Sequence, residues 1–248
     1  MPARVNLYEE ELDILLDQRG NNAEWQKAIV CSCVSSDSGQ PDFSCPICGG
    51  SGFRYTSPKK IIVGVTALSN NKILESVGLR EPGCAYVTPK SDVIMGYRDR
   101  IRFPDFKCIF SQTIKWEGAN TISNKTYREL KGVEYLADDK YEYEEGIDFK
   151  ITPDNMHLEW INPKIFDSIK DRNLSIRYLT TPSYLVADIL HELRATLSDR
   201  KTSSPTFREL PKQYKMVRED FIYNVKEDGG KPPTDEIVPE ITEAGVII

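Results

Sequence analysis

The sequence predicts an α+β protein that is mainly antiparallel β-sheet, arranged as a sandwich or a small barrel, with a helical, cysteine-rich N-terminal module. Many short segments rich in β-branched residues lie close together and are bounded by glycine, proline and asparagine. Helical periodicity is rare, and strands do not alternate with helices as they do around a parallel sheet. The chain has 248 residues, 40% of them hydrophobic, so it can bury a core without disulfides.

The N-terminal segment predicts an amphipathic helix over residues 7–18. Its apolar residues stand among glutamate and aspartate, and they are Leu7, Leu12, Ile14, Leu15 and Leu16. Gly20 then ends the helix. We expect a second, short helical turn over residues 23–29, with Trp25 in the core of the same module.

Four of the six cysteines follow directly, within positions 31 to 48. They form a C-x-C pair, eleven further residues and a C-x-x-C pair, and they are Cys31, Cys33, Cys45 and Cys48. Two close thiolate pairs separated by a loop suit a tetrahedral Zn²⁺ with four sulfur ligands. Glycines at positions 49, 50 and 52 permit the positive φ angles that a tight knuckle requires. The sequence therefore predicts a zinc knuckle with these four cysteines as metal ligands.

Other uses of these cysteines are weaker. Two disulfides would suit a secreted protein, but acidic residues occupy the N-terminus where an export signal carries basic ones. A redox C-x-x-C usually opens a helix, which the following glycines would break. A catalytic zinc keeps an open position and commonly has a histidine ligand, and no histidine is near, so we expect a structural metal. Cys84 and Cys108 are interpreted as small core residues.

Short strands are predicted through the body of the chain. They cover residues 53–56, 60–68, 83–88, 100–114, 133–137, 141–151, 157–161 and 174–178. A hairpin with its turn at residues 152–155 brings Phe149 and Ile151 opposite Leu158 and Trp160. Helix competes with strand only over residues 72–77 and after Tyr184. We divide the chain into a helical and zinc-knuckle module (1–52), a β-rich body (53–223) and an extended C-terminal tail (224–248).

Charge is unevenly distributed along the chain. Its 32 basic and 38 acidic residues give a net charge of −6, so no general attraction to nucleic acid or to anionic membrane is expected. Residues 138–148 are rich in aspartate and glutamate, which we interpret as a solvated face that blunts edge pairing, rather than as a metal or acid–base site.

One stretch, residues 194–218, is basic. It holds seven basic residues, Arg194, Arg200, Lys201, Arg208, Lys212, Lys215 and Arg218, against the acidic Asp199 and Glu209. Such a patch can contact phosphates, pair with an acidic surface on a neighbouring protein, or be solvated. The tail 224–248 ends in Val-Ile-Ile, which suits a strand added to another subunit.

Motifs of the common enzyme classes are not found. The sequence has no phosphate loop, dinucleotide fingerprint, nucleophile elbow or His-Glu-x-x-His. His157 and His191 lie in apolar-periodic segments and are interpreted as structural. We therefore expect no catalytic residues. Apolar runs are far below the ~20 residues of a membrane span, so we expect no membrane-spanning segment. The N-terminus carries acidic residues where an export signal carries basic ones, so we expect an intracellular protein that does not bind membranes.

Several of these motifs together resemble a known family. Residues 24–28, the two cysteine pairs and Phe53-Arg-Tyr55 are similar to the cysteine-knuckle opening of tailed-bacteriophage structural proteins of the neck or head-to-tail connector. Residues 145–160, 176–178, 182–184 and 210–212 look like the body of the same proteins, so the resemblance covers roughly residues 20–220. The tighter first pair, Cys31-Ser-Cys33, departs from the C-x-x-C of an ordinary zinc ribbon.

The resemblance implies a virion protein that lies below the portal in a ring of many copies and closes the filled head or joins it to the tail. Its partners would be copies of itself, the portal, and tail or neck proteins, and it would be found in the virion and, during assembly, in the host cytoplasm. An alternative is a nucleic-acid-binding zinc protein, a packaging or transcription accessory. Against this, residues 25–53 contain one basic residue, Lys27, so contact with DNA would be non-specific and would use the basic stretch.

Overall fold

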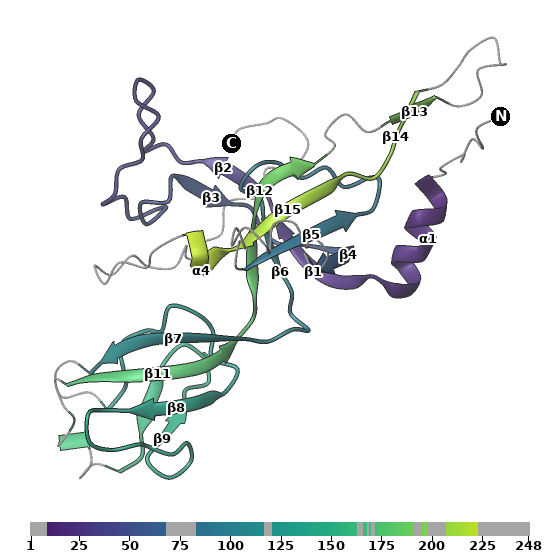
Figure 1. The fold of residues 1–248 in the computed structure, drawn as a ribbon. Helices are drawn as coiled ribbons and strands as arrows, with labels where there is room; N and C mark the ends of the chain where they lie inside the picture. The colour runs from purple at the N-terminus through teal and green to yellow at the C-terminus, as the bar shows by residue number, and fades with distance from the viewer. Residues whose placement is uncertain are drawn as a thin grey trace, which may run out of the picture. The chain divides into compact units, whose positions relative to one another are not determined.

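The computed structural model describes residues 9–67, 83–116, 121–162, 166–167, 169, 172–190, 195–197 and 207–222. The prediction of a mainly antiparallel β protein is confirmed, and a barrel is present. The chain forms two compact units, Met1–Phe103 with Ser183–Ile248 and Pro104–Pro182, which we call the barrel unit and the insert unit. Figure 1 shows their elements. None of the helices in the described ranges is both long enough and apolar enough to span a membrane.

The barrel unit is built on a closed antiparallel barrel with the strand order β1-β4-β5-β15-β12-β6. Its strands are β1 (Asn21–Gln26), β4 (Lys59–Ala67), β5 (Cys84–Pro89), β6 (Arg100–Arg102), β12 (Ser183–Leu190) and β15 (Gln213–Arg218). Trp25, Val63, Ile101 and Tyr214 are among the side chains that fill its interior. The Tyr214 hydroxyl accepts a hydrogen bond from the Met95 amide at 3.1 Å, so the buried polar atom has a partner.

Hairpins of this barrel are extended by further elements. Between β1 and β4 the chain forms β2 (Ala28–Val30) and β3 (Phe53–Tyr55), which pair with each other. Between β12 and β15 it forms the paired β13 (Ala195–Leu197) and β14 (Phe207–Glu209). The whole insert unit is inserted between β6 and β12, which are neighbours in the barrel.

The predicted helical turn over residues 23–29 is wrong, because this segment forms β1 and β2. Ala23 and Trp25 both point into the barrel and Glu24 lies between them, a period of two that suits a strand. β1 pairs with β4 and with β6, whose residues are distant in sequence, and this pairing outweighs any local helical tendency. The segment after Tyr184 is likewise strand β12, whereas residues 72–77 lie outside the described residues.

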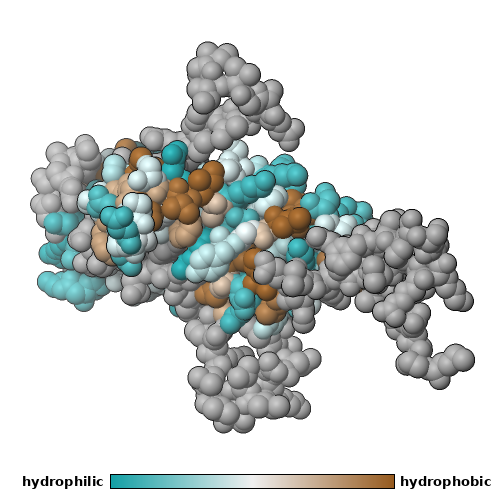
Figure 2. All heavy atoms as spheres, turned by 90° about the horizontal axis from the view of Figure 1, so that it is seen from above, coloured by the Kyte–Doolittle hydropathy of each residue, from teal (hydrophilic) through white to brown (hydrophobic). Residues whose placement is uncertain are grey.

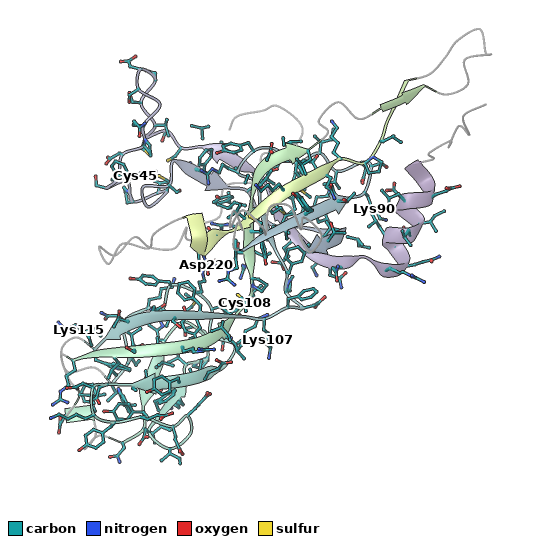
Figure 3. The ribbon with its side chains drawn as sticks, in the orientation of Figure 1. Cys45, Lys90, Lys107, Cys108, Lys115 and Asp220 are labelled. Carbon is teal, nitrogen blue, oxygen red and sulfur yellow. The ribbon has the colours of Figure 1, made fainter. Side chains whose placement is uncertain are left out.

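The predicted N-terminal helix is present as α1 (Glu9–Arg19). Leu16 is its buried contact: its side chain approaches Gly64 of β4 so closely that a Cβ there would lie 3.1 Å away. Asp13 accepts hydrogen bonds from the Ser91 amide and hydroxyl, and Asp17 pairs with Lys90 at 2.5 Å. Lys90 is labelled in Figure 3. Ile14 and Leu15 are exposed, so the helix docks mainly through polar contacts and one leucine.

The predicted division at residues 52 and 223 differs from the one observed. β1 belongs to the same barrel as β4 and β5, so residues 1–52 are not separate from the strands that follow. Residues 104–182 separate from the rest instead, since they have a core of their own. The tail 224–248 lies outside the described residues.

The insert unit contains the sheet β7-β11-β8 and the hairpin β9-β10. The strands are β7 (Cys108–Lys115), β8 (Val133–Ala137), β9 (Phe149–Ile151), β10 (Leu158–Trp160) and β11 (Asn173–Thr180). The predicted hairpin is confirmed, with Ile151 opposite Leu158 and Phe149 opposite Trp160. Trp160 lies in its core, with ring centroids 5.0 Å from Tyr143 and 5.3 Å from Trp116.

The acidic stretch 138–148 is only partly a solvated face. Asp139, Glu142, Glu144 and Glu145 are exposed, as predicted. Asp138 is different: its side chain is 1% exposed and accepts hydrogen bonds from the amides of Lys140 and Tyr141 and from the Tyr143 hydroxyl. These bonds hold the pKa of Asp138 below its usual value against the opposing effect of burial. Of the predicted strand 141–151, only β9 forms; Glu142 and Glu145 make isolated bridges, and residues 146–148 form a turn.

Candidate metal centre

The structure brings the four predicted ligands together at the end of the β2–β3 hairpin. We call β2, the loop 31–52 and β3 the cysteine ribbon (residues 28–55). The sulfurs of Cys31, Cys33, Cys45 and Cys48 all lie within 4.8 Å of one another. The Sγ atoms of Cys31 and Cys45 are 3.9 Å apart and those of Cys33 and Cys48 are 3.5 Å apart. No disulfide joins these four residues, so all are available as ligands.

These distances fit one metal ion with tetrahedral coordination. Four sulfurs at about 2.3 Å from an ion are about 3.8 Å from one another. The two short distances, 3.5 and 3.9 Å, lie on either side of this value. Within the described residues the cluster contains no histidine or carboxylate, so four sulfurs would close the coordination shell. The cluster can therefore hold a metal ion and leave no open position for a substrate.

The backbone of the second cysteine pair wraps around its sulfurs. The Gly49 amide donates to the carbonyl of Cys45 at 2.9 Å, and the Gly52 amide donates to the sulfur of Cys48 at 3.4 Å. Gly49, Gly50 and Gly52 have φ values of 58°, 81° and 78°, which confirms the predicted role of these glycines. A Cβ at Gly50 would also lie 3.0 Å from the Phe43 carbonyl oxygen.

Two of the thiols have strongly shifted pKa values. The backbone amides of Cys48 and Ile47 donate to the sulfur of Cys45 and lower its pKa to about 7. Burial raises the pKa of Cys33 to about 12. Of these two, Cys45 is about half thiolate at pH 7, whereas a metal ion has to displace the proton of Cys33.

The cysteine ribbon continues the β1–β4 hairpin of the barrel. The Lys27 amide donates to the Thr56 hydroxyl at 2.9 Å, and the Thr56 amide donates to the Lys27 carbonyl at 3.0 Å. Beyond this link Ala28 pairs with Tyr55 and Val30 with Phe53. The Cys31 amide donates to the Gly52 carbonyl at 2.8 Å and closes the ladder at the metal cluster.

A buried carboxylate attaches the base of the ribbon to the barrel. Asp99 is 4% exposed and accepts hydrogen bonds from the Trp25 indole and from the amides of Ala28 and Gly96, each at 2.8 Å. These donors belong to β1, to β2 and to the segment before β6. Three charge-assisted hydrogen bonds satisfy the carboxylate, and they orient β2 where it leaves the barrel.

Arg100, the next residue, holds the other strand of the ribbon. Its guanidinium carbon lies 3.7 Å from the ring centroid of Tyr55 in β3. Its Nη2 also pairs with Glu219 at 2.7 Å, where α4 (Glu219–Ile222) begins, and both side chains are nearly buried. Residues 99 and 100 thus anchor both strands of the ribbon.

Sequence reasoning placed Trp25 in a core but did not find Asp99 or Arg100. Trp25 is 6% exposed, as expected. Asp99 and Arg100 look like ordinary surface charges in the sequence, because their partners are up to 119 positions away. A signal that points toward Asp99 is Trp25, since a buried indole N–H needs an acceptor.

Other residues singled out in the sequence lie elsewhere. Cys84 and Cys108 are half-buried, in β5 and β7. His157 lies in the insert unit, with Nδ1 2.7 Å from Asp154 in the β9–β10 turn, and His191 is outside the described residues. Of the seven basic residues between 194 and 218, the structure describes the side chains of Lys212, Lys215 and Arg218. Arg218 donates to Asp220 at 2.7 Å.

The four cysteines are therefore the one group of potential metal ligands that the described part of the chain gathers in one place. The distances among the four sulfurs, and the contacts of Asp99 and Arg100 that anchor the ribbon, are observed in this chain alone. Comparison with known proteins adds no relative: no model of a protein family matches the sequence, and a search of curated proteins found none that is similar.

Proposed function

We propose that this protein is a structural component of a tailed-bacteriophage virion. In this proposal it assembles as a ring beneath the portal, as part of the neck or head-to-tail connector, and it acts by binding its neighbours rather than by catalysis. The observation that supports the proposal is the architecture: a small closed barrel carries a cysteine ribbon and an insert unit on its hairpins. Such extensions suit a part that contacts several other chains at once.

A ring built by rotation requires two different, complementary surfaces on every subunit. A compact barrel of short strands has little surface area for two such interfaces. The cysteine ribbon and the insert unit provide additional surface area. Charge adds a second argument, since exposed carboxylates gather over residues 139–145 of the insert unit and Lys212 and Lys215 belong to the barrel unit. Opposite charges of this kind steer neighbouring subunits together more than they add affinity.

The metal in this proposal is a structural Zn²⁺ held by Cys31, Cys33, Cys45 and Cys48. Four thiolates in tetrahedral arrangement are the donor set that zinc prefers in structural sites. The ribbon needs such an ion because its buried hydrophobic residues are Cys31, Cys45 and Cys48, with Cys33 and Val34 packed against them. An ion at the centre of the thiolates replaces the apolar core that so short a segment cannot form.

A nucleic-acid-binding zinc protein is the weaker alternative. The cysteine ribbon contains a single basic residue, Arg54, whereas a zinc module that binds DNA presents several to the phosphates. Contact with DNA would then depend on the basic residues between 194 and 218.

The proposal is tested by the mass of the full-length protein in solution together with its metal content. We expect a large ring with one zinc per chain, measured by native mass spectrometry and elemental analysis. A protein that stays monomeric over the whole accessible concentration range would contradict ring assembly. A salt-dependent shift of duplex DNA by that monomer would favour the alternative, whereas a chain purified without zinc would contradict the assigned metal.

A further inference from the structure

Two short sulfur–sulfur contacts join the two halves of the cysteine cluster. Between Sγ atoms, Cys31 is 3.9 Å from Cys45 and Cys33 is 3.5 Å from Cys48. Each contact pairs one residue of the C-x-C motif with one residue of the C-x-x-C motif. The sulfurs of a disulfide are about 2 Å apart, so a small movement of these side chains is enough to form one across each contact. The ribbon therefore contains two dithiol pairs as well as four metal ligands.

The four sulfurs differ in how easily a small solute reaches them. Cys33 is half-buried, whereas the side chains of the other three cysteines are 1% to 6% exposed. Oxidation of a cysteine depends on its exposure and on its thiolate character, and metal binding turns all four into thiolates. A small oxidant in solution therefore meets the sulfur of Cys33 first.

The large apolar side chains of the ribbon do not cover the cluster. Val30 is 61% exposed and Phe43 is 79% exposed, and Ile29 and Ile47 are exposed as well. On the face drawn in Figure 2, apolar residues likewise lie at the surface between polar ones. Besides Cys33, the apolar side chain that packs against the three buried cysteines is Val34. The cluster is therefore shielded by the folded loop 31–52 rather than by a thick apolar layer.

We propose that a peroxide exchanges the bound ion for two disulfides, one across each short sulfur contact. The pairs are Cys31 with Cys45 and Cys33 with Cys48. This inference rests on the zinc of the proposed function, but it does not depend on ring assembly. The ribbon then holds zinc in a reducing compartment and is cross-linked in an oxidising one. A virion protein would meet both conditions, because it is assembled inside a cell and then leaves it.

The exchange consumes two molecules of hydrogen peroxide per chain. The Cys33 thiolate attacks the O–O bond, which breaks and leaves a sulfenic acid on Cys33 and a hydroxide ion. The Cys48 thiolate, 3.5 Å away, then attacks the Cys33 sulfur, and a second hydroxide leaves as the disulfide forms. Cys31 and Cys45 react with the second peroxide in the same way. Four thiolates lose four electrons in all, the two peroxides are reduced to water, and the sulfurs no longer bind a divalent ion.

The two disulfides should preserve part of the fold that the ion supports. The two pairings interleave along the chain, so they tie both ends of the loop 31–48 together. They lie beside the bond from the Cys31 amide to the Gly52 carbonyl, which already closes the ladder. Cross-links restrict the unfolded chain where the metal no longer holds the folded one. Amides 31–52 of the oxidised protein should therefore exchange with solvent more slowly than those of the reduced, metal-free protein.

The test treats the full-length, zinc-loaded protein with hydrogen peroxide. Zinc release is followed with a chromophoric chelator too weak to remove zinc from the untreated protein. Proteolysis and mass spectrometry without reductant map the disulfides, and a dose below one peroxide per chain shows which pair forms first. The matched control variant carries Cys84→Ala and Cys108→Ala, which change the two half-buried cysteines outside the cluster.

We expect the loss of one zinc for every two peroxides consumed, with the disulfide of Cys33 and Cys48 formed first. The control variant should release zinc at the wild-type rate, and excess thiol with added zinc should restore the metal content. A protein that binds no zinc contradicts the assigned metal, and the exchange with it. Zinc that is retained at a peroxide dose that converts free cysteine to cystine overturns the exchange alone. A disulfide between Cys45 and Cys48 overturns the proposed pairing.

Discussion

The cysteine ribbon and the insert unit are both extensions of barrel hairpins, but different forces hold them together. In its described residues the insert unit buries a cluster of thirteen hydrophobic residues, including Trp116, Trp160 and Tyr178. The corresponding cluster of the ribbon consists of three buried cysteines, with Cys33 and Val34 against them. A segment of about 30 residues cannot bury enough apolar surface to offset its loss of conformational entropy, whereas one of about 80 residues can. A metal ion held by the four cysteines would provide the missing energy in the ribbon.

The largest effect should come from removing the metal. Chelation, or Cys45→Ser, should unfold residues 31–52, because structural zinc contributes roughly 10 kcal/mol to the folding of such modules. The amides of this segment should then exchange rapidly in hydrogen–deuterium exchange, while the barrel and insert strands keep their protection. Protection of the ribbon that survives complete metal removal would show that it does not need the ion.

The next largest expected effect is the dependence of the metal affinity on pH. Cys33, whose pKa is raised to about 12, has to release a proton when a metal ion binds at any pH in the neutral range. This proton release lowers the metal affinity about tenfold for each unit by which the pH is lowered. Cys45, with its pKa lowered to about 7, adds a further tenfold per unit only below that pH. Competition with a chromophoric chelator between pH 8 and 6 measures the slope. A slope that does not steepen as pH falls through 7 would contradict the assignment of Cys45.

Trp160→Ala should lower the stability of the insert unit and leave the cysteine ribbon unchanged. The indole is buried between Tyr143, Trp116 and Phe149, so its loss leaves a cavity and should cost about 3–5 kcal/mol of the stability of the insert unit. Denaturation followed by fluorescence and circular dichroism measures this cost. The variant should still bind one zinc per chain, since the ribbon has its own source of stability. Loss of zinc in parallel with the insert unit would show that the two extensions are not independent.

A smaller effect is expected at the base of the ribbon. Asp99→Ala leaves the buried Trp25 indole and the Ala28 amide without their acceptor and should cost about 2–3 kcal/mol in thermal or chemical unfolding. Asp99→Asn keeps one carbonyl oxygen and should cost less. Both variants should retain zinc, because the ligands lie beyond Ala28. Equal stability of Asp99→Ala and the wild type would mean that water replaces the carboxylate.

Much of the metal centre could be predicted from the sequence because its parts are local. The ligand spacing, the glycines at 49, 50 and 52 and the absence of a nearby histidine all lie within one short stretch. The β9–β10 hairpin was predictable for the same reason. Its turn is local, and the paired residues Phe149 and Trp160 are close in sequence. The error at residues 23–29 arose where local signals were weak and distant strands decided the conformation.

The sequence by itself determined that this is a mainly antiparallel β protein with four cysteines spaced for one metal ion, because periodicity of two and ligand spacing are properties of neighbouring residues. Only the tertiary structure decided that β1 closes a barrel with β4 and β6, that residues 104–182 form a separate unit, and that Asp99 and Arg100 anchor the ribbon. These features join residues up to 119 positions apart, and such contacts form because of shape, burial and charge in the folded chain. The charge of Asp99 looks like a surface feature in the sequence, and it becomes an anchor only once three donors surround it.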